Sequence, residues 1–423
     1  MKRPLPAGWR EARLGFLVDT QVPQRDKPDP LTGPIPWVRI EDFDGQDIRA
    51  SKSGQGVTPE QVHAMNLRVF EPGTVMCSCS CSMGATAIVR EPLVSNQTFI
   101  GLKPGKELES RFLFYLMGAM REELQANATG AIQQYLSRDD FRSLRIPLPP
   151  PDEQRRIADF LDAETARIDT LTSAKERASA LIDERRLALT SQMCLRGLDV
   201  TAPMRDTGIA PLGAVPAHWP IMRNKNFMRE ITDLSQEGNE ELLTVSHLTG
   251  VTPRSEKTVY MFQAESMIGY KLCHPGDLVI NTLWAWMGAL GISRYEGIVS
   301  PAYGVYRFTS GEVLPEYFDL LFRTPEYVAE MTRYSKGVWT SRLRLYPESF
   351  LALRTPVPPL AAQKIIVDTV KRENAPGLKL QDAIRRSNLL LSERRQALIT
   401  AAVTGQFDVY AASGRNVTEG VSA

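Results

Sequence analysis

The chain of 423 residues is longer than one ordinary domain and can form two substantial hydrophobic cores. Its 50 Lys and Arg residues against 49 Asp and Glu give a formal net charge of +1, so composition alone indicates no polyanionic partner. A hydrophobic content of 43% with 23% charged residues excludes disorder and collagen-like repeats. Five cysteines, an N-terminus without a signal-peptide core and the lack of any apolar run of about 18 residues predict a cytoplasmic protein.

Residues 1–150 are predicted to form a first globular part with a mixed α/β fold. Short β-rich runs, such as residues 74–77, are bounded by Gly and Pro, which is typical of strands. A helix is expected at residues 110–120, where apolar positions recur at helical spacing.

Residues 151–200 are predicted to form one long helix. Prolines precede it, and Asp152 is a suitable N-cap. Apolar residues then recur at heptad a and d positions: Ile157, Leu161, Ile168, Leu171, Ala178, Ile182 and Leu189. A stripe of this length needs a partner, because most helical stability comes from packing an apolar face.

The second half of the chain repeats the first. Pro6-Ala7-Gly8-Trp9 returns as Pro216-Ala217-His218-Trp219, Met83-Gly84-Ala85 as Met287-Gly288-Ala289, and Glu184-Arg185-Arg186 as Glu393-Arg394-Arg395. Residues 201–357 are therefore predicted to form a second α/β part, residues 358–409 a second long helix and residues 410–423 a flexible tail. Pro376-Gly377 should kink or break that second helix.

Charged residues at a-type positions suggest how the two helices pair. If the helices run antiparallel about a pseudo-twofold axis, pairing Glu164 with Arg394 places Arg185 opposite Glu373. We therefore predict these two inter-helix ion pairs, which would set the register more than add stability. The alternative is that all four are solvated charges on imperfect heptads.

The strand that follows each Gly-containing turn carries unusual side chains. Cys77, Cys79 and Cys81 alternate, whereas zinc sites usually need C-x₂₋₄-C spacing and a second pair of ligands. We interpret them as small core residues and predict no metal site. The second copy has Trp284 and Trp286 on the opposite strand face, and we favour a core role for them over a binding platform.

Local catalytic motifs are lacking. The sequence has no G-x-x-x-x-G-K-[ST], no G-x-G-x-x-G after a strand and no lysine with an acidic residue two positions earlier. Its four histidines are scattered, although a triad assembled from distant residues stays open.

The repeated α/β–helix module resembles the specificity subunit of type I restriction–modification enzymes. The residues that carry the resemblance are Pro-x-x-Trp at the start of each copy, Pro149-Pro150-Pro151-Asp152-Glu153-Gln154 and Pro358-Pro359-Leu360-Ala361-Ala362-Gln363. The resemblance implies two target-recognition domains, residues 1–150 and 201–357, separated by two antiparallel helices that form a coiled-coil spacer. Ala362 in place of the first copy's Glu153, together with Pro376-Gly377, is a departure from the pattern in the second helix.

The same resemblance implies a non-catalytic subunit that binds double-stranded DNA and needs no cofactor of its own. Each domain would read half of a bipartite, asymmetric site, two methyltransferase subunits would dock on the helices, and motor–nuclease subunits can join them. Base reading requires polar and basic loop residues. The expected contacts are Lys52, Asn96, Gln97, Gln133, Gln134, Ser137 and Arg138 in the first copy and Lys336, Trp339, Thr340, Ser341, Arg342 and Arg344 in the second.

Two other classes of function stay open, a non-catalytic two-domain scaffold that binds proteins and an enzyme with a distant triad. The neutral charge also bears on the DNA-binding interpretation, because phosphate neutralisation supplies most non-specific affinity. The isolated chain is therefore expected to bind DNA weakly, and tight, salt-sensitive binding is expected only with the methyltransferase partners.

Overall fold

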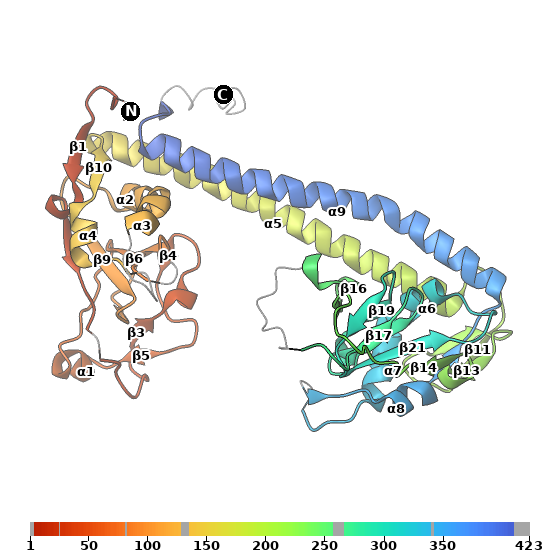
Figure 1. Ribbon diagram of the computed structural model, residues 1–423. Coiled ribbons are helices and arrows are strands. Elements are labelled where there is room, and N and C mark those ends of the chain that lie inside the picture. Colours follow the sequence, from red (N-terminus) through yellow and green to blue (C-terminus); the bar gives the residue numbers. More distant parts are fainter. Residues whose placement is uncertain are drawn as a thin grey trace. The chain divides into compact units, whose positions relative to one another are not determined.

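The computed structural model describes residues 4–24, 26–80, 83–127, 135–256, 266–339 and 342–409, and the chain divides into two compact units (Figure 1). Unit 1 comprises residues 1–175 and 386–423, and unit 2 comprises residues 176–385. Each unit holds one α/β part and one end of each long helix, α5 (Pro151–Arg196) and α9 (Leu360–Val403). The mixed α/β fold expected from the sequence is confirmed. In the described part of the chain, no helix combines the length and the apolar character needed to cross a membrane.

The α/β part of unit 1 is built on a five-stranded sheet with the order β2-β9-β6-β7-β4. Its strands are β2 (Val18–Gln21), β9 (Phe99–Pro104), β6 (Val75–Ser78), β7 (Thr86–Val89) and β4 (Asp47–Ile48), and only the β4–β7 pair is parallel. A smaller sheet contains β5 (Gly56–Val57), β3 (Ile35–Val38) and β8 (Val94–Ser95). Strand β1 (Arg10–Arg13) pairs with β10 (Arg145–Leu148), which leads into α5. The helices of this part are α1 (Pro59–Ala64), α2 (Ser110–Ala119), α3 (Arg121–Asn127) and α4 (Arg138–Ser143).

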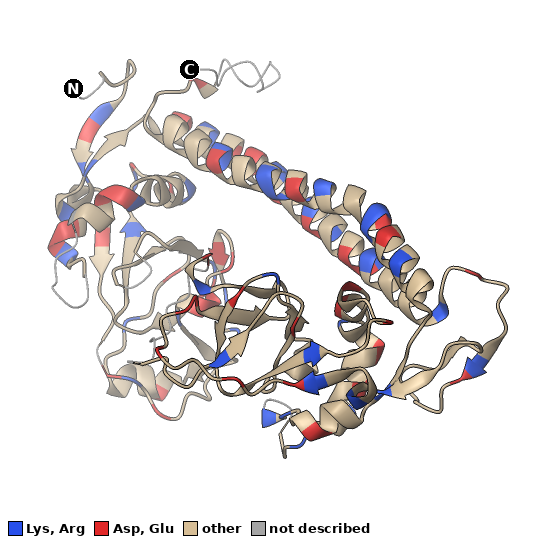
Figure 2. Ribbon diagram, turned by 45° about the vertical axis from the view of Figure 1, so that its right-hand side comes forward, with Lys and Arg blue, Asp and Glu red and all other residues tan. Residues whose placement is uncertain are grey.

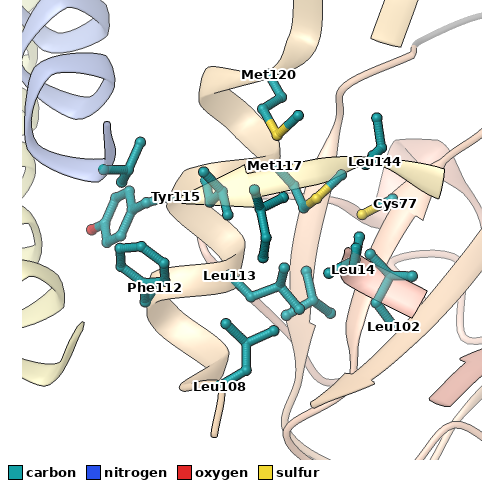
Figure 3. Packing of buried hydrophobic residues seen from close by; sticks show 14 of the residues in the cluster. Leu14, Cys77, Leu102, Leu108, Phe112, Leu113, Tyr115, Met117, Met120 and Leu144 are labelled. Carbon is teal, nitrogen blue, oxygen red and sulfur yellow. The ribbon is translucent and has the colours of Figure 1, made fainter. Parts of the chain in front are cut away.

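The main core of unit 1 lies between α2 and the large sheet. Phe112 and Met117 of α2 belong to one buried cluster with Leu14, Cys77 and Leu102, and Figure 3 shows Met117 on the side of α2 toward Cys77. The Cys77 and Cys79 side chains are fully buried, and burial raises the pKa of both thiols. The interpretation of these two cysteines as core residues is confirmed, while Cys81 lies outside the described residues.

Unit 2 repeats this plan around the four-stranded antiparallel sheet β14-β21-β18-β19. These strands are β14 (Met228–Glu230), β21 (Tyr303–Phe308), β18 (Leu278–Asn281) and β19 (Leu290–Ile292). The strand pairs are β11 (Met204–Asp206) with β12 (Ala214–Pro216), β13 (Ile221–Arg223) with β22 (Arg354–Pro356), β15 (Leu243–Ser246) with β16 (Gly250–Pro253), and β17 (Lys271–Cys273) with β20 (Gly297–Val299). The helices are α6 (Pro315–Phe322), α7 (Pro325–Tyr334) and α8 (Pro347–Ala352).

The segment after β18 differs from the expectation. The strand ends at Asn281, whose Oδ1 accepts a hydrogen bond from the Leu283 backbone N–H at 3.2 Å, so the chain turns before the tryptophans. Trp284 is 51% exposed and precedes the 3₁₀ helix η5 (Ala285–Met287). The interpretation of Trp284 as a core residue is therefore wrong, and Trp286 is only half-buried.

Helix α9 continues through Pro376, so the break expected there does not occur. The carbonyl that loses its helical partner belongs to Arg372, an exposed residue that water can reach. The next residue, Gly377, packs closely against α5, because a Cβ atom at this position would lie 2.9 Å from Ile182 Cγ2. Absence of a side chain at Gly377 thus allows the two helices to approach each other within unit 2.

The antiparallel arrangement of α5 and α9 is confirmed within each unit, and its register is close to the prediction. The expected pairing would place Ile182 opposite Pro376, and Ile182 in fact meets Gly377, one residue further along. In unit 2, Gln381 Nε2 donates to the Ser179 carbonyl at 3.1 Å. In unit 1, the Arg395 guanidinium forms an ion pair with Asp169.

The two predicted ion pairs are wrong. Glu164–Arg394 and Arg185–Glu373 are not among the ion pairs of the described residues; Glu164 instead pairs with Arg167 at 3.9 Å and Glu373 with Arg372 at 3.3 Å. Arg185 is exposed, and the arginine that faces the other helix in each copy is the next one, Arg186 or Arg395.

The assignment failed because the middle of the α5 stripe is polar. Leu171 and Ala178, which the heptads placed on the stripe, are exposed, whereas Thr172 and Ser179 are half-buried. In this segment the residues that face the other helix are not the apolar ones. A heptad assignment based on apolar residues is therefore displaced by one position from the residues that make the contact.

Candidate nucleic-acid interface

A buried glutamine fixes the start of each long helix to its α/β part. Gln154 Oε1 accepts a hydrogen bond from the Glu109 backbone N–H at 2.8 Å, and its Nε2 donates to the carbonyls of Glu107 and Pro149 at 2.8 and 2.9 Å. In unit 2, Gln363 makes the same three kinds of contact, with Leu314, Glu312 and Pro358. Both side chains are fully buried. The Pro-Pro-x-x-x-Gln pattern therefore anchors the helix and holds the adjoining loops in place.

The Pro-x-x-Trp pattern has an equally local explanation. The residue after α5, Gly197, has φ +72°, and a Cβ atom on it would lie 3.1 Å from the Trp219 ring. In unit 1, Gly405 has φ +75°, and its Cβ position lies 3.3 Å from the Trp9 ring. Each tryptophan thus packs against the left-handed glycine that ends a long helix in its own unit.

The expected DNA contacts of unit 2 lie on one loop between α7 and α8. Lys336 and Arg344 close this loop, because each donates its backbone N–H to the other's carbonyl at 2.9 Å. Directly after it, the buried Leu345 donates its N–H to the Thr282 carbonyl at 2.9 Å and anchors the loop to the turn after β18. Trp339 is 69% exposed, and Arg342 is exposed as well. Thr340 and Ser341 lie outside the described residues.

Two cations of this loop share one aromatic ring. The Lys336 Nζ and the Arg344 Cζ lie 5.6 and 5.2 Å from the centre of the Tyr346 ring. Cation–π contacts of this kind are attractive and help to hold both long side chains in place, and Lys336 is exposed. The loop therefore presents positive charge from a defined base.

In unit 1 the corresponding segment precedes α4. Ser137 is the N-cap of α4, since its Oγ accepts the Asp140 N–H at 3.2 Å and its own N–H donates to the Asp140 carboxylate at 2.7 Å. This capping box gives Ser137 a structural role, because its hydroxyl is engaged by the helix end. Arg138 is exposed at the first position of α4. Gln133 and Gln134 lie outside the described residues.

The structure brings the Asn96–Gln97 turn close to the segment before α4. The two segments lie on either side of Cys79. The Cys79 N–H donates to the Thr98 carbonyl, and the Cys79 carbonyl accepts the Leu136 N–H, each at 2.9 Å. Asn96 Oδ1 accepts a 2.6 Å hydrogen bond from the Thr98 hydroxyl and shapes the turn, whereas Gln97 is exposed. Lys52 lies on the loop between β4 and β5, where its Nζ is 3.4 Å from the Asp44 carboxylate.

Sequence reasoning missed Tyr346. It lies 209 residues after Ser137 and occupies the same N-cap position, but offers a ring instead of a capping hydroxyl. The repeat offset could have identified Tyr346. The preceding residue is a buried leucine in both copies, Leu136 or Leu345, whereas the residue at this position itself differs between the copies.

Charge is distributed evenly elsewhere. Figure 2 shows Lys and Arg interspersed with Asp and Glu along the long helices and over the α/β parts. The basic character of the loop between α7 and α8 is therefore local rather than part of a broad positive face.

Comparisons with known proteins agree with this architecture. Residues 8–178 match the family model described as the type I restriction modification DNA specificity domain. The type I restriction enzyme MjaIX specificity subunit of Methanocaldococcus jannaschii is 29% identical over 191 residues, which are 44% of this chain and 43% of that protein. The EcoBI specificity subunit of Escherichia coli is 24% identical over 391 residues, covering 88% of this chain and 80% of that relative.

A solved structure supports the fold over almost the full length. One chain, from a study of complex assembly and conformational transition of the type I R-M system, has a TM-score of 0.67 at 18% sequence identity and covers 96% of this chain and 100% of its own length. Residues 8–178 thus match the type I restriction modification DNA specificity domain, and the chain as a whole is similar in sequence to type I restriction enzyme specificity subunits.

Proposed function

We propose that this chain is the non-catalytic subunit that gives a type I restriction–modification enzyme its DNA sequence specificity. In this proposal the α/β parts, residues 1–150 and 201–357, are target-recognition domains that read the two halves of a bipartite site on double-stranded DNA. The helical parts, residues 151–200 and 358–409, are the spacer. The complex works in the cytoplasm, where its DNA substrate is.

One observation supports the proposal most strongly: both copies attach their long helix to the α/β part in the same way, but carry different loops before α4 and α8. Gln154 and Gln363 hold each helix to its α/β part through the same three hydrogen bonds, so the frame is shared. The loops before α4 and α8 differ in their exposed residues, and sequence is read by such side chains in the grooves. Two frames with two different reading surfaces fit an asymmetric, bipartite site.

Exposed apolar side chains on the long helices support docking of partner proteins. Leu181 is 64% exposed and Leu390 is 63% exposed. Leu389, next to Leu390 on α9, is 62% exposed as well, and adjoining exposed apolar side chains, more than single ones, mark protein interfaces. We assign these surfaces to two methyltransferase subunits, which would supply adenine methylation from adenosylmethionine, and motor–nuclease subunits can join the complex.

Sequencing of methylated bases in the genome tests the proposal. A strain that expresses the methyltransferase subunits should carry one bipartite methyladenine motif, and deletion of the gene for this chain should abolish it. An unchanged methylation pattern in the deletion strain would refute the proposal. If the chain instead bound partner proteins but left methylation untouched, it would be the two-domain scaffold.

Binding measurements separate the contributions of the subunits. The isolated chain should bind DNA weakly because its α/β parts are nearly neutral, with 18 basic and 17 acidic residues in residues 1–150. Tight, salt-sensitive binding to the methylated motif should require the methyltransferase subunits. Equal affinity with and without them would contradict this division of labour.

A further inference from the structure

The loop between α7 and α8 carries two large apolar side chains at the surface. Val338 is 93% exposed and Trp339 is 69% exposed. Isolated exposed apolar residues are ordinary, but here two adjacent ones occupy a loop closed at its base by the Lys336–Arg344 backbone pair. Val338 and Trp339, named the apolar tip here, are therefore exposed next to the fixed base of the loop.

Backbone contacts define how this tip is held. Gly337 fits where a side chain would not, because a Cβ atom on it would lie 2.6 Å from the Arg342 carbonyl oxygen. The Arg342 N–H donates to the Trp339 carbonyl at 2.8 Å, and Leu345 ties the end of the loop to Thr282. The tryptophan backbone is thus positioned before any ligand binds, which reduces the entropy lost on binding.

The charges around the tip identify its ligand as a polyanion with apolar faces. Lys336, Arg342 and Arg344 are in no ion pair among the described residues, whereas nearby Arg333 pairs with Glu330 at 2.8 Å. Tyr346 supports Lys336 and Arg344 through its ring, and of these two cations Lys336 is exposed while Arg344 is half-buried. DNA combines phosphates with apolar base faces, and proteins that deform it place apolar side chains between base steps beside such cations.

We propose that Val338 and Trp339 enter the DNA half-site bound by unit 2 as an apolar wedge and unstack one base step. Lys336 and Arg344 contact the phosphates beside that step, and Tyr346 positions both cations. This inference rests on the proposed function, since it assumes that unit 2 binds a half-site. The wedge favours a pyrimidine–purine step, because these steps unstack most easily.

Permanganate footprinting tests the wedge, because permanganate oxidises thymines that have lost their stacking. The full chain is assembled with the methyltransferase subunits on duplex DNA that carries the bipartite motif found by methylation sequencing. The wild-type complex should give one hyperreactive thymine step in the unit 2 half-site. Trp339→Ala should abolish that reactivity and weaken binding roughly 5- to 150-fold, the range for losing one base–aromatic contact. Trp339→Phe should retain most of both.

Leu248→Ala is the matched control. Leu248 is 78% exposed at the tip of the β15–β16 hairpin in unit 2, so its loss removes an equally accessible apolar group from another loop. This variant should leave the footprint and affinity unchanged.

The outcomes separate the two proposals. If the wild-type complex does not bind a bipartite motif, the proposed function fails. If it binds but Trp339→Ala keeps both the reactive thymine and the affinity, the wedge is refuted. If Trp339→Ala instead lowers recovery of the methyltransferase subunits with the chain, the tip is a protein contact and the inference is overturned.

Discussion

The anchoring glutamine of the first copy makes a measurable prediction for stability. In Gln154→Ala, the Glu109 N–H and the Glu107 and Pro149 carbonyls lose their partner. Each intramolecular hydrogen bond contributes about 1 kcal/mol net, so the free energy of unfolding of unit 1 should fall by about 3 kcal/mol. For a folding unit of this size, that loss lowers Tm by about 6–12 °C.

Differential scanning calorimetry of the full chain is the assay, because it can resolve separate transitions for two units. Gln192→Ala is the control: Gln192 lies on the same helix but is exposed, so its loss should shift Tm by no more than about 1 °C. Gln363→Ala should lower the other transition by a similar amount. If Gln154→Ala behaves like Gln192→Ala, the three contacts do not anchor the helix and the structural reading of the Pro-Pro-x-x-x-Gln pattern is wrong.

Three further predictions concern single sites. Gly377→Val should lower the free energy of unfolding of unit 2 by about 1–3 kcal/mol, because its Cβ would meet Ile182. Gly118→Ala, with open space around it, should raise the free energy of unfolding by up to about 1 kcal/mol by stabilising α2. Urea titration measures both changes, and a stabilising effect of Gly377→Val would contradict the close helix contact. Burial raises the pKa of Cys273 to about 11, so Ellman's reagent at pH 8 should modify this thiol only after unfolding, and rapid native labelling would disprove its burial. Lys336→Met should reduce the slope of log affinity against log salt concentration by about 1 in the DNA complex; an unchanged slope would remove this lysine from the phosphate contacts.

The sequence predicted most of the α/β parts and the two long helices, because these elements depend on local sequence patterns. The expected helix at residues 110–120 is α2 (Ser110–Ala119), and its equivalent in the second copy is α6 (Pro315–Phe322). The predicted antiparallel register of α5 and α9 differs from the observed one by one residue at the Ile182–Gly377 contact. The prediction came this close because the repeat places equivalent residues of the two helices at a constant offset. The ion pairs failed because the arginines that face the other helix, Arg186 and Arg395, lie one position later than the heptad placed them.

The candidate interface was harder to predict because loop residues take their roles from neighbours distant in sequence. Ser137 looked like a base contact but caps α4, whereas its counterpart Tyr346 supports two cations. Trp284 looked like a core residue because β18 seemed to continue, and only the turn at Asn281 exposes it. Composition could not distinguish these cases, since each depends on where the backbone turns.

The two copies divide their positions into a shared buried set and a variable exposed set. Leu136 and Leu345 are both buried and make the same backbone contact to the turn after the central strand, while the residue after each one differs completely. A change at such an exposed position alters what a loop can contact without removing a core contact, so specificity can diverge at little cost in stability. The neutral charge fits the same division. Under the proposed function, cations gathered on one loop, such as Lys336 and Arg344, would place phosphates beside the base-contacting residues, and most of the affinity would come from partner subunits rather than from a positive face of this chain.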